Sequence, residues 1–422
     1  MKKITSSIFI TLVLFLISNS ISWAQNRSSI YVHGLGGDET QWADWQALFN
    51  QERRMQTESN IDNEIASRTG VANFAAQVPT PPNNNTIVFG HSTGGVVARH
   101  IERTRVNPFG GIITAGAPMD GARISNNLAN GQAANFIVNG VDKVLKGPIR
   151  EFGPTAGVVF QVASHLFKDM AEREVNRVLN TSQTNATSTD LAEGSAYMNN
   201  GMRAQASAMP KIHIYGNENG PVLWRIASVA ANWGDGELVS ATQQGYEVCR
   251  ALKLANIGKA ITHPWNAIRF NYQAQGWGIS EDWLKDGSER GWNDLIGASI
   301  PASITTSSQV LNYTGFSQCM TAFANSNGGQ TTFAQYQQCQ QQNTTTVFYT
   351  SYSPINGLSD GFIKAPSQTG YNSPWSNNST RIEALGVNHL EMRSHQVMGD
   401  IYNRVFNGQV LGQDPFFITA IR

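Results

Sequence analysis

The residue of this chain best suited to nucleophilic chemistry is Ser92, which stands in the segment 90–94, Gly-His-Ser-Thr-Gly. The segment follows a β-branched and aromatic run, Thr86 to Phe89, and precedes a stretch with a helical pattern, Gly95 to Val106. A strand, a sharp turn and a helix form the context that the motif needs, because only glycine neighbours let the backbone hold a serine in a strained, exposed geometry. The pattern therefore predicts a nucleophilic serine, and hydrolytic chemistry, at Ser92.

A serine hydroxyl is a weak nucleophile unless a base accepts its proton and an acid orients that base. His389 is expected to be the base, since it stands on a short loop after the last predicted strand. The acid comes between serine and histidine in the chain order typical of this motif. Asp360 is the favoured acid because it is nearer to His389 in the sequence. Asp235 is the alternative, either as the acid or as a turn residue without a catalytic role.

Two backbone amides are needed to stabilise a developing oxyanion. One is expected from Thr93, the residue after the nucleophile, and the other from Leu35. Leu35 lies in the glycine-rich segment 33–37, directly after the predicted strand Ser29 to Val32. Glycine neighbours keep the backbone open there, as such a site requires.

Strands and helices alternate along the parts of the chain that carry these residues. This alternation predicts an α/β fold with a parallel sheet and helices on both faces. The predicted strands are Ser29–Val32, Thr86–Phe89, Gly111–Ala115, Lys211–Tyr215, Thr346–Tyr349 and Arg381–Leu385. The predicted helices are Gln41–Phe49, Ile61–Val78, Gly95–Val106 and a C-terminal helix from about Glu391 to Phe406.

Two long insertions interrupt this alternation. The first, at about 121–209, has apolar residues at helical spacing over 159–178, and we expect it to form a helical cap or lid. The second, at about 245–346, is rich in Trp, Gly, Gln and Thr, and its nearly uncharged tail, 325–346, is expected to be an exposed loop.

The cysteines bear on the second insertion. Cys319 and Cys339 flank a polar segment, and the sequence leaves open whether they form a disulfide. Cys249 is then expected to be a buried, small apolar residue.

The N-terminus has the pattern of a signal peptide. Two lysines are followed by a short apolar run, and small residues precede a cleavage site predicted after Ala24. Residues 1–24 are therefore predicted to be removed, residues 25–422 to form a single domain, and the protein to be secreted or periplasmic. The 30 basic and 30 acidic residues balance, so nothing indicates nucleic acid as a partner.

Taken together, these residues resemble the α/β-hydrolase superfamily, in its lipase and esterase branch. The matching segments occur in the order usual for the family: Val32–Gly37, Gly90–Gly95, Gly116–Pro118, Ser359–Gly361 and Asn388–Met392. The resemblance implies the α/β-hydrolase fold, with a mostly parallel central sheet, helices on both faces and a helical cap. It also implies carboxyl-ester hydrolysis through an acyl-enzyme, without a cofactor.

The partner implied by this resemblance is a small-molecule or lipid ester, and a transient contact with a lipid interface is compatible with it. The sequence leaves the oligomeric state open. The same residues would also serve an acyltransferase or an amidase, because fold and catalytic residues do not determine the acceptor. A third reading is a non-catalytic surface-binding protein on a hydrolase scaffold. The ten tryptophans and the polar tail of the second insertion favour this reading.

Overall fold

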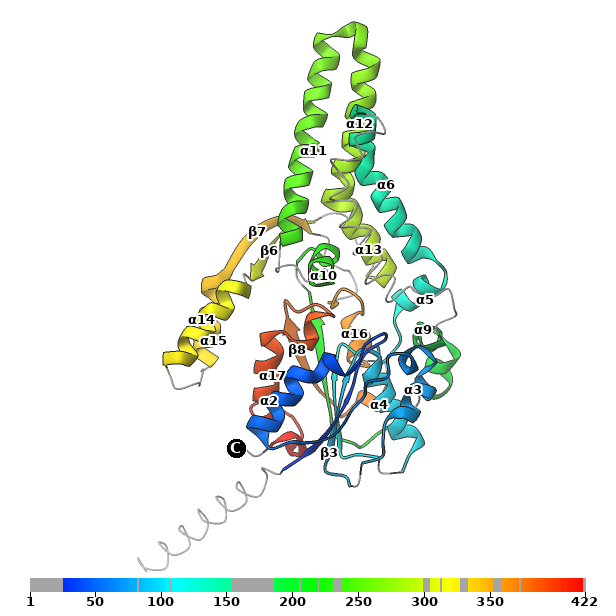
Figure 1. Ribbon diagram of the computed structural model, residues 1–422, viewed down its shortest axis with the longest axis vertical. Helices are drawn as coiled ribbons and strands as arrows, with labels where there is room; N and C mark the ends of the chain where they lie inside the picture. Colours follow the sequence, from blue (N-terminus) through cyan, green and yellow to red (C-terminus); the bar gives the residue numbers. More distant parts are fainter. Residues whose placement is uncertain are drawn as a thin grey trace, which may run out of the picture.

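The computed structural model describes residues 26–419 except 82, 107, 153–185, 203, 205, 219, 231–236, 299–303, 312, 327–332, 352–357 and 372. Its central sheet has six parallel strands in the order β2-β1-β3-β4-β5-β8 (Figure 1). Their bounds are β1 Ser28–Val32, β2 Gln56–Asn60, β3 Thr86–His91, β4 Gly111–Ala115, β5 Lys211–Asn217 and β8 Thr380–Leu385. The predicted parallel sheet is confirmed.

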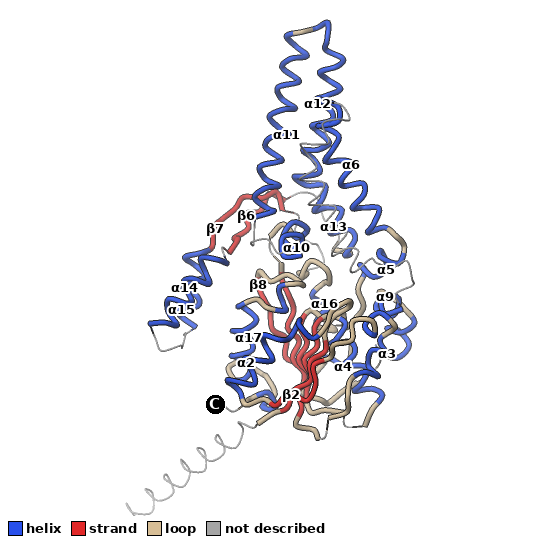
Figure 2. The backbone as a smooth tube through the Cα atoms, in the orientation of Figure 1, coloured by secondary structure: helices blue, strands red, loops and turns tan. Residues whose placement is uncertain are grey.

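Both faces of the sheet are covered by helices, so that β1, β3, β4 and β5 are buried along nearly their whole length. On one face, Phe49 and Phe406 pack with Phe89 in one apolar core. On the other face, Val97 packs with Val88 in a second apolar core. The helices that cover the sheet are α2 Ala43–Arg53 and α17 Gln396–Phe406 on the first face, and α3 Val71–Gln77 and α4 Thr93–Thr104 on the second. Figure 2 shows the strands enclosed between these helices.

Two parts of this core differ from the predictions. Strand β2 is not among the predicted strands, because its residues Gln56–Asn60 are polar and lie half-exposed at the edge of the sheet. The single helix predicted over 61–78 is wrong in its first half. The chain forms only the short 3₁₀ helix η2, Ala66–Arg68, before Gly70, whose φ of 113° precedes the start of α3.

The described residues between β4 and β5 are mainly helical. The helices are α5 Arg123–Ala129, α6 Gln132–Phe152, α9 Ala186–Leu191 and η5 Met198–Met202. The apolar helical pattern at 159–178 lies outside the described residues. The long helix α6 rises above the edge of the sheet at which the strands end (Figure 1).

The stretch between β5 and β8 begins with a helical bundle. Its elements are α10 Val222–Ala230, α11 Glu237–Thr262, η6 Pro264–Asn266, α12 Ala267–Asp282, η7 Trp283–Gly287 and α13 Ser288–Ile296. The long helices α11 and α12 form a hairpin that projects beyond the rest of the molecule, with α6 beside its lower part (Figure 1). Cys249 on α11 is a free, buried cysteine, as predicted. None of the described helices combines the length and the apolar character needed to cross a membrane.

A small antiparallel sheet follows, formed by β6 Ile304–Leu311 and β7 Thr344–Ser351. The strand predicted at Thr346–Tyr349 is therefore present, but it belongs to this second sheet. The exposed loop expected over 325–346 is wrong for the residues described there, because helix α15, Phe333–Asn343, occupies much of it. A disulfide between Cys319 and Cys339 joins α15 to α14, Tyr313–Ser326.

The remaining elements are short. They are η1 Glu39–Trp42, α16 Ala365–Gln368, η8 Pro374–Ser376, η9 Glu391–Arg393 and η10 Pro415–Phe417. The loop between β8 and η9 carries His389, and the loop before α16 carries Asp360, so both lie at the edge of the sheet where the strands end.

Candidate active site

Ser92 lies in a sharp turn between β3 and α4. Its backbone has a φ of 53° and a ψ of −125°, in the positive-φ region that residues other than glycine rarely adopt. The flanking glycines are required by space. A Cβ on Gly90 would lie 2.5 Å from the amide nitrogen of Gly95, and a Cβ on Gly94 would lie 2.2 Å from the carbonyl oxygen of Val32. The turn that the motif predicted is therefore present, with a strained serine at its apex.

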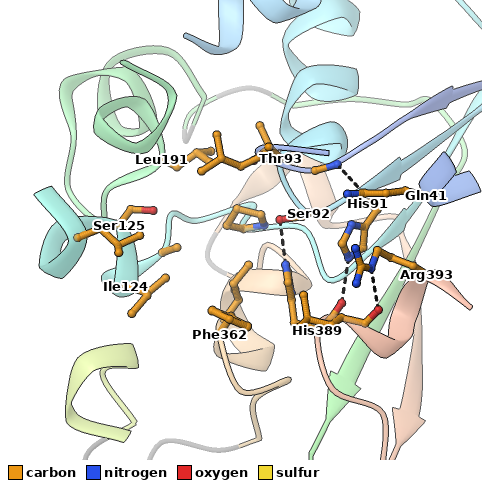
Figure 3. Close-up of a pocket in the computed structure, with 18 residues that line it drawn as sticks. Gln41, His91, Ser92, Thr93, Ile124, Ser125, Leu191, Phe362, His389 and Arg393 are labelled. Atoms are coloured by element: carbon orange, nitrogen blue, oxygen red, sulfur yellow. Dashed lines mark hydrogen bonds between the residues drawn. The ribbon is translucent and has the colours of Figure 1, made fainter. Parts of the chain in front are cut away.

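His389 contacts this serine directly. Its Nε2 lies 2.9 Å from Oγ of Ser92 (Figure 3). The backbone of His389 is also held, since its N–H donates to the carbonyl of Asp360 at 2.8 Å. Its own carbonyl lies 3.0 Å from Nε2 of His91. His389 is thus held by hydrogen bonds to two distant parts of the chain, the turn at His91 and Ser92 and the loop at Asp360.

Asp360 completes the chain of hydrogen bonds. Its Oδ2 lies 2.6 Å from Nδ1 of His389, while its Oδ1 accepts from the amides of Phe362 at 3.0 Å and Ile363 at 2.7 Å. The carboxylate is fully buried. An acceptor at Nδ1 keeps the proton on that nitrogen, so Nε2 is left to accept from the serine hydroxyl. The structure thus joins Ser92, His389 and Asp360, while Asp235 lies outside the described residues.

Glycines make room for this carboxylate. Gly116, after β4, has a φ of 59°, and a Cβ there would lie 3.0 Å from Oδ2 of Asp360 and 3.1 Å from Nδ1 of His389. A Cβ on Gly216, near the end of β5, would lie 2.6 Å from Cβ of Asp360. Two neighbouring strands therefore leave space at their ends for the acid and the imidazole to meet.

The two amides predicted to face an oxyanion belong to the same pocket. Leu35 and Thr93 line it together with Ser92 and His389. Neither amide N–H donates a hydrogen bond to any group in the described part of the chain. The turn around Leu35 is held in place by its neighbours, since the amide of Gly36 donates to Oγ of Ser67 at 2.9 Å. Both amides therefore remain available to a bound ligand.

The rest of the pocket is mainly apolar. Figure 3 shows Ile124 and Leu191 from the first insertion on one side of Ser92, with Phe362 nearby. The polar lining includes Ser125 and Gln41. The apolar residues that line the pocket are Leu35, Pro118, Ala122, Ile124, Leu128, Leu191, Phe362, Ile363 and Leu390. A pocket of this composition suits a hydrophobic group next to the reactive serine. The described residues contain no cluster of His, Cys, Asp and Glu suited to a metal ion.

A buried ion-pair network supports the histidine loop. Arg225 on α10 donates from Nη2 to both carboxylate oxygens of Glu391, at 3.0 and 3.2 Å, and from Nη1 to Glu218. Glu391 in turn accepts from the amide of Asn388 at 2.9 Å. The sequence gives no signal for this network, because no short motif links α10 to a loop more than 150 residues later. It ties helix α10 to the loop that carries His389.

The known proteins that this chain resembles are solved structures. No protein-family model and no curated protein matches the sequence. An extracellular α/β-hydrolase from a Paenibacillus species is 11% identical, with a TM-score of 0.25, and the match covers 45% of this chain and 77% of that one. MenH from S. aureus is 15% identical, with a TM-score of 0.23 over 49% and 81%. An esterase from Rhodococcus is 15% identical, with a TM-score of 0.24 over 46% and 74%.

The fold is identified by features of the chain itself. The first strand of the sheet lies between β2 and β3, and β4, β5 and β8 follow in sequence order toward the opposite edge. A sharp turn with a serine at its apex follows β3, and the loop after β8 carries the histidine. The described core of this protein therefore has the α/β-hydrolase fold.

Proposed function

We propose that the protein is a serine hydrolase that cleaves carboxylic esters through an acyl-enzyme intermediate. One observation carries this proposal: the continuous chain of hydrogen bonds from Oγ of Ser92 through His389 to Oδ2 of Asp360. The donor and acceptor order along this chain is the one needed for His389 to remove the proton from the serine.

In the proposed reaction, Oγ of Ser92 attacks the ester carbonyl as Nε2 of His389 takes up its proton. The amides of Leu35 and Thr93 donate to the oxyanion that forms. The alcohol then leaves with the proton from His389, and a water molecule, deprotonated by the same nitrogen, releases the acid from the serine. The negative charge of Asp360 stabilises the imidazolium in both steps. No cofactor takes part.

The apolar lining supports an ester with a hydrophobic acyl or alcohol group. Leu191 and Ile124, both from the first insertion, contribute to this lining, so the insertion takes part in selecting the substrate. We also propose that the protein is exported from the cytoplasm. It is supported by the signal-like residues 1–24 and by the Cys319–Cys339 disulfide, because such bonds persist mainly in oxidising compartments.

The proposal is tested by hydrolysis of p-nitrophenyl esters from acetate to palmitate by the chain without residues 1–24. We expect turnover that Ser92→Ala lowers by about 10⁶-fold in kcat. Ser240→Ala, at an exposed serine of α11 that does not line the pocket, is the matched control and is expected to keep the activity. The preferred chain length then distinguishes an esterase from a lipase.

Two results would contradict the proposal. Turnover unaffected by Ser92→Ala would place the chemistry elsewhere. Absence of turnover across the series would favour an amidase or an acyltransferase. Amide substrates would then test for the amidase, and added alcohols or amines would test for acyl transfer. Ligand binding without any turnover would instead favour the non-catalytic scaffold.

A further inference from the structure

We propose that the tip of the α11–α12 hairpin is a docking surface for lipid membranes that contain anionic headgroups. The tip consists of the end of α11, η6 and the start of α12, residues 257–272. The surface itself is independent of the catalytic proposal, and only its connection to lipid esters rests on the proposed function.

The tip exposes large apolar side chains. Trp265 is 96% exposed, Ile268 89% and Ile261 77%. Seven of the fifteen large hydrophobic residues that are exposed in the described part of the chain lie on this hairpin: Val248, Leu254, Ile257, Ile261, Trp265, Ile268 and Tyr272. A concentration of this kind at one end of a molecule is typical of a surface that binds another body, because single exposed apolar residues are usually scattered.

The hairpin is anchored directly below its tip and projects beyond this anchor. Glu151 near the end of α6 accepts from Nδ2 of Asn256 at 2.7 Å and from Nε1 of Trp277 at 2.5 Å, which joins the three helices. Beyond this junction the tip extends past the described end of α6 (Figure 1). Helix α11 alone is about 39 Å long, from its 26 residues. The tip is thus carried well away from the sheet on a firm support.

The charges of the tip determine which partner fits. The tip, residues 257–272, contains two basic residues and no Asp or Glu, although the whole chain has equal numbers of basic and acidic residues. Lys259 and Arg269 lie among the exposed apolar side chains, and both are exposed themselves, with Nζ of Lys259 4.0 Å from Oε1 of Glu151 on α6. Basic residues beside Trp and Ile are the combination that binds an anionic lipid surface, where the apolar groups enter the interface and the cations meet the headgroups.

The tip does not line the pocket at Ser92. Docking would therefore hold the protein at the membrane rather than open or close the site. The hairpin lies toward the edge of the sheet at which the strands end (Figure 1). The pocket is lined by Ser92 and His389, which follow β3 and β8 at the same edge, so a docked protein would face the membrane with that edge. With the proposed esterase chemistry, this orientation favours esters that leave or enter the lipid surface.

Vesicle flotation tests the inference directly. The chain without residues 1–24 is mixed with vesicles of phosphatidylcholine alone, or of phosphatidylcholine with phosphatidylglycerol. We expect flotation with the mixed vesicles and much less with phosphatidylcholine alone. The double variant Trp265→Ser, Ile268→Ser is expected to bind about 100-fold more weakly, because it removes two apolar side chains that would enter the interface. The matched control Val106→Ser, Leu411→Ser alters residues that are 90% and 100% exposed elsewhere, and it should float like the wild type.

The charges are tested separately. Lys259→Gln with Arg269→Gln is expected to weaken binding to the mixed vesicles by about 30-fold and to reduce its salt dependence. Flotation of the wild type with neither kind of vesicle would overturn the inference. Equal loss in the Val106, Leu411 control would also overturn it, since binding would then depend on general surface hydrophobicity.

A further measurement separates a membrane from other occupants of the tip. Without vesicles, a cysteine introduced by Trp265→Cys is expected to react rapidly with a polar thiol reagent. Protection of this cysteine, or an oligomer that Trp265→Ser dissociates, would show that another part of the chain or a second copy covers the tip, and would overturn the inference.

Turnover of a short, soluble ester should be the same in all tip variants, while Ser92→Ala should float normally. Failure of docking and failure of the catalytic proposal are therefore distinguishable.

Discussion

The ring of His91, the residue before the nucleophile, contacts the backbone carbonyl of His389 through Nε2 at a distance of 3.0 Å. Burial is the main reason why the pKa of His91 lies well below its usual value, and the nearby charges of His389 and Arg393 add to the effect. The ring is therefore neutral near pH 7, and its protonated nitrogen must be Nε2 if it is to donate to the carbonyl. His91 thus holds the loop that carries the proposed base.

Replacing His91 tests this positioning role. His91→Ala leaves the carbonyl of His389 without its donor, and we expect kcat to fall by about tenfold, with little change in KM. His91→Gln keeps an amide that can donate and should retain most of the activity. Steady-state kinetics on a p-nitrophenyl ester would check both. Equal kcat values for the wild type and the alanine variant would show that the loop needs no such support.

The choice of acid is a second prediction. Asp360→Asn is expected to lower kcat by about 10⁴-fold while Ser92 stays in place, because an amide at this position favours the wrong tautomer of His389. Asp235→Asn is expected to leave kcat nearly unchanged. Both variants should be compared by kcat and by the thermal unfolding midpoint. A large loss in the Asp235 variant alone would reverse the assignment.

A third prediction concerns the buried ion pairs of Arg225. Arg225→Met leaves the carboxylates of Glu218 and Glu391 buried without their cation, and we expect the free energy of unfolding to fall by about 3–5 kcal/mol. Arg103→Met, at an exposed arginine of α4, is the control and should change it by less than about 0.5 kcal/mol. Denaturant unfolding measures both. A loss no larger than that of the control would show that the network contributes little.

Asp400 on α17 gives a fourth prediction, on pH dependence. Burial raises the pKa of this carboxyl to about 6, against the opposing effect of Arg404, and Oδ2 has no hydrogen-bond partner among the described residues. The folded state therefore binds the proton more tightly than the unfolded chain. The resulting stabilisation is fully present below about pH 3.8, the usual pKa of an aspartate, and is lost as the pH rises through about 6.

Asp400→Asn should accordingly raise the thermal unfolding midpoint at pH 8 and leave it nearly unchanged at pH 4. Asp62→Asn, at an exposed position, is the control and should show no such difference between the two pH values. An Asp400 variant that is less stable than the wild type at pH 8 would contradict the argument.

The parts of the protein that the sequence predicted are those with strict local requirements. The turn at Ser92 requires glycine at positions 90 and 94, so it leaves a clear motif in the sequence. The strands β1, β3, β4 and β5 are buried between two layers of helices, so each leaves a short run rich in apolar residues. The polar edge strand β2 has no apolar pattern. The helix α11 was missed because its apolar residues do not form a single stripe, and several of them remain exposed. Chain order allowed either Asp235 or Asp360 as the acid, and Asp360 was favoured because it is nearer to His389 in the sequence. The support from Arg225 arises only when α10 packs beside the histidine loop.

The neighbouring strands β5 and β8 are separated in the sequence by residues 218–379. Forming this pair closes a very long loop, and contacts of high sequence separation form slowly. We therefore expect β8, and the histidine loop after it, to join the sheet late in folding, after β1, β3, β4 and β5 have paired. The entropic cost of such a loop grows by only about 0.6 kcal/mol for each doubling of its length. Evolutionary insertions or deletions in the hairpin would consequently change the stability of the sheet little. The distance between the tip and the sheet can therefore change without altering the site around Ser92.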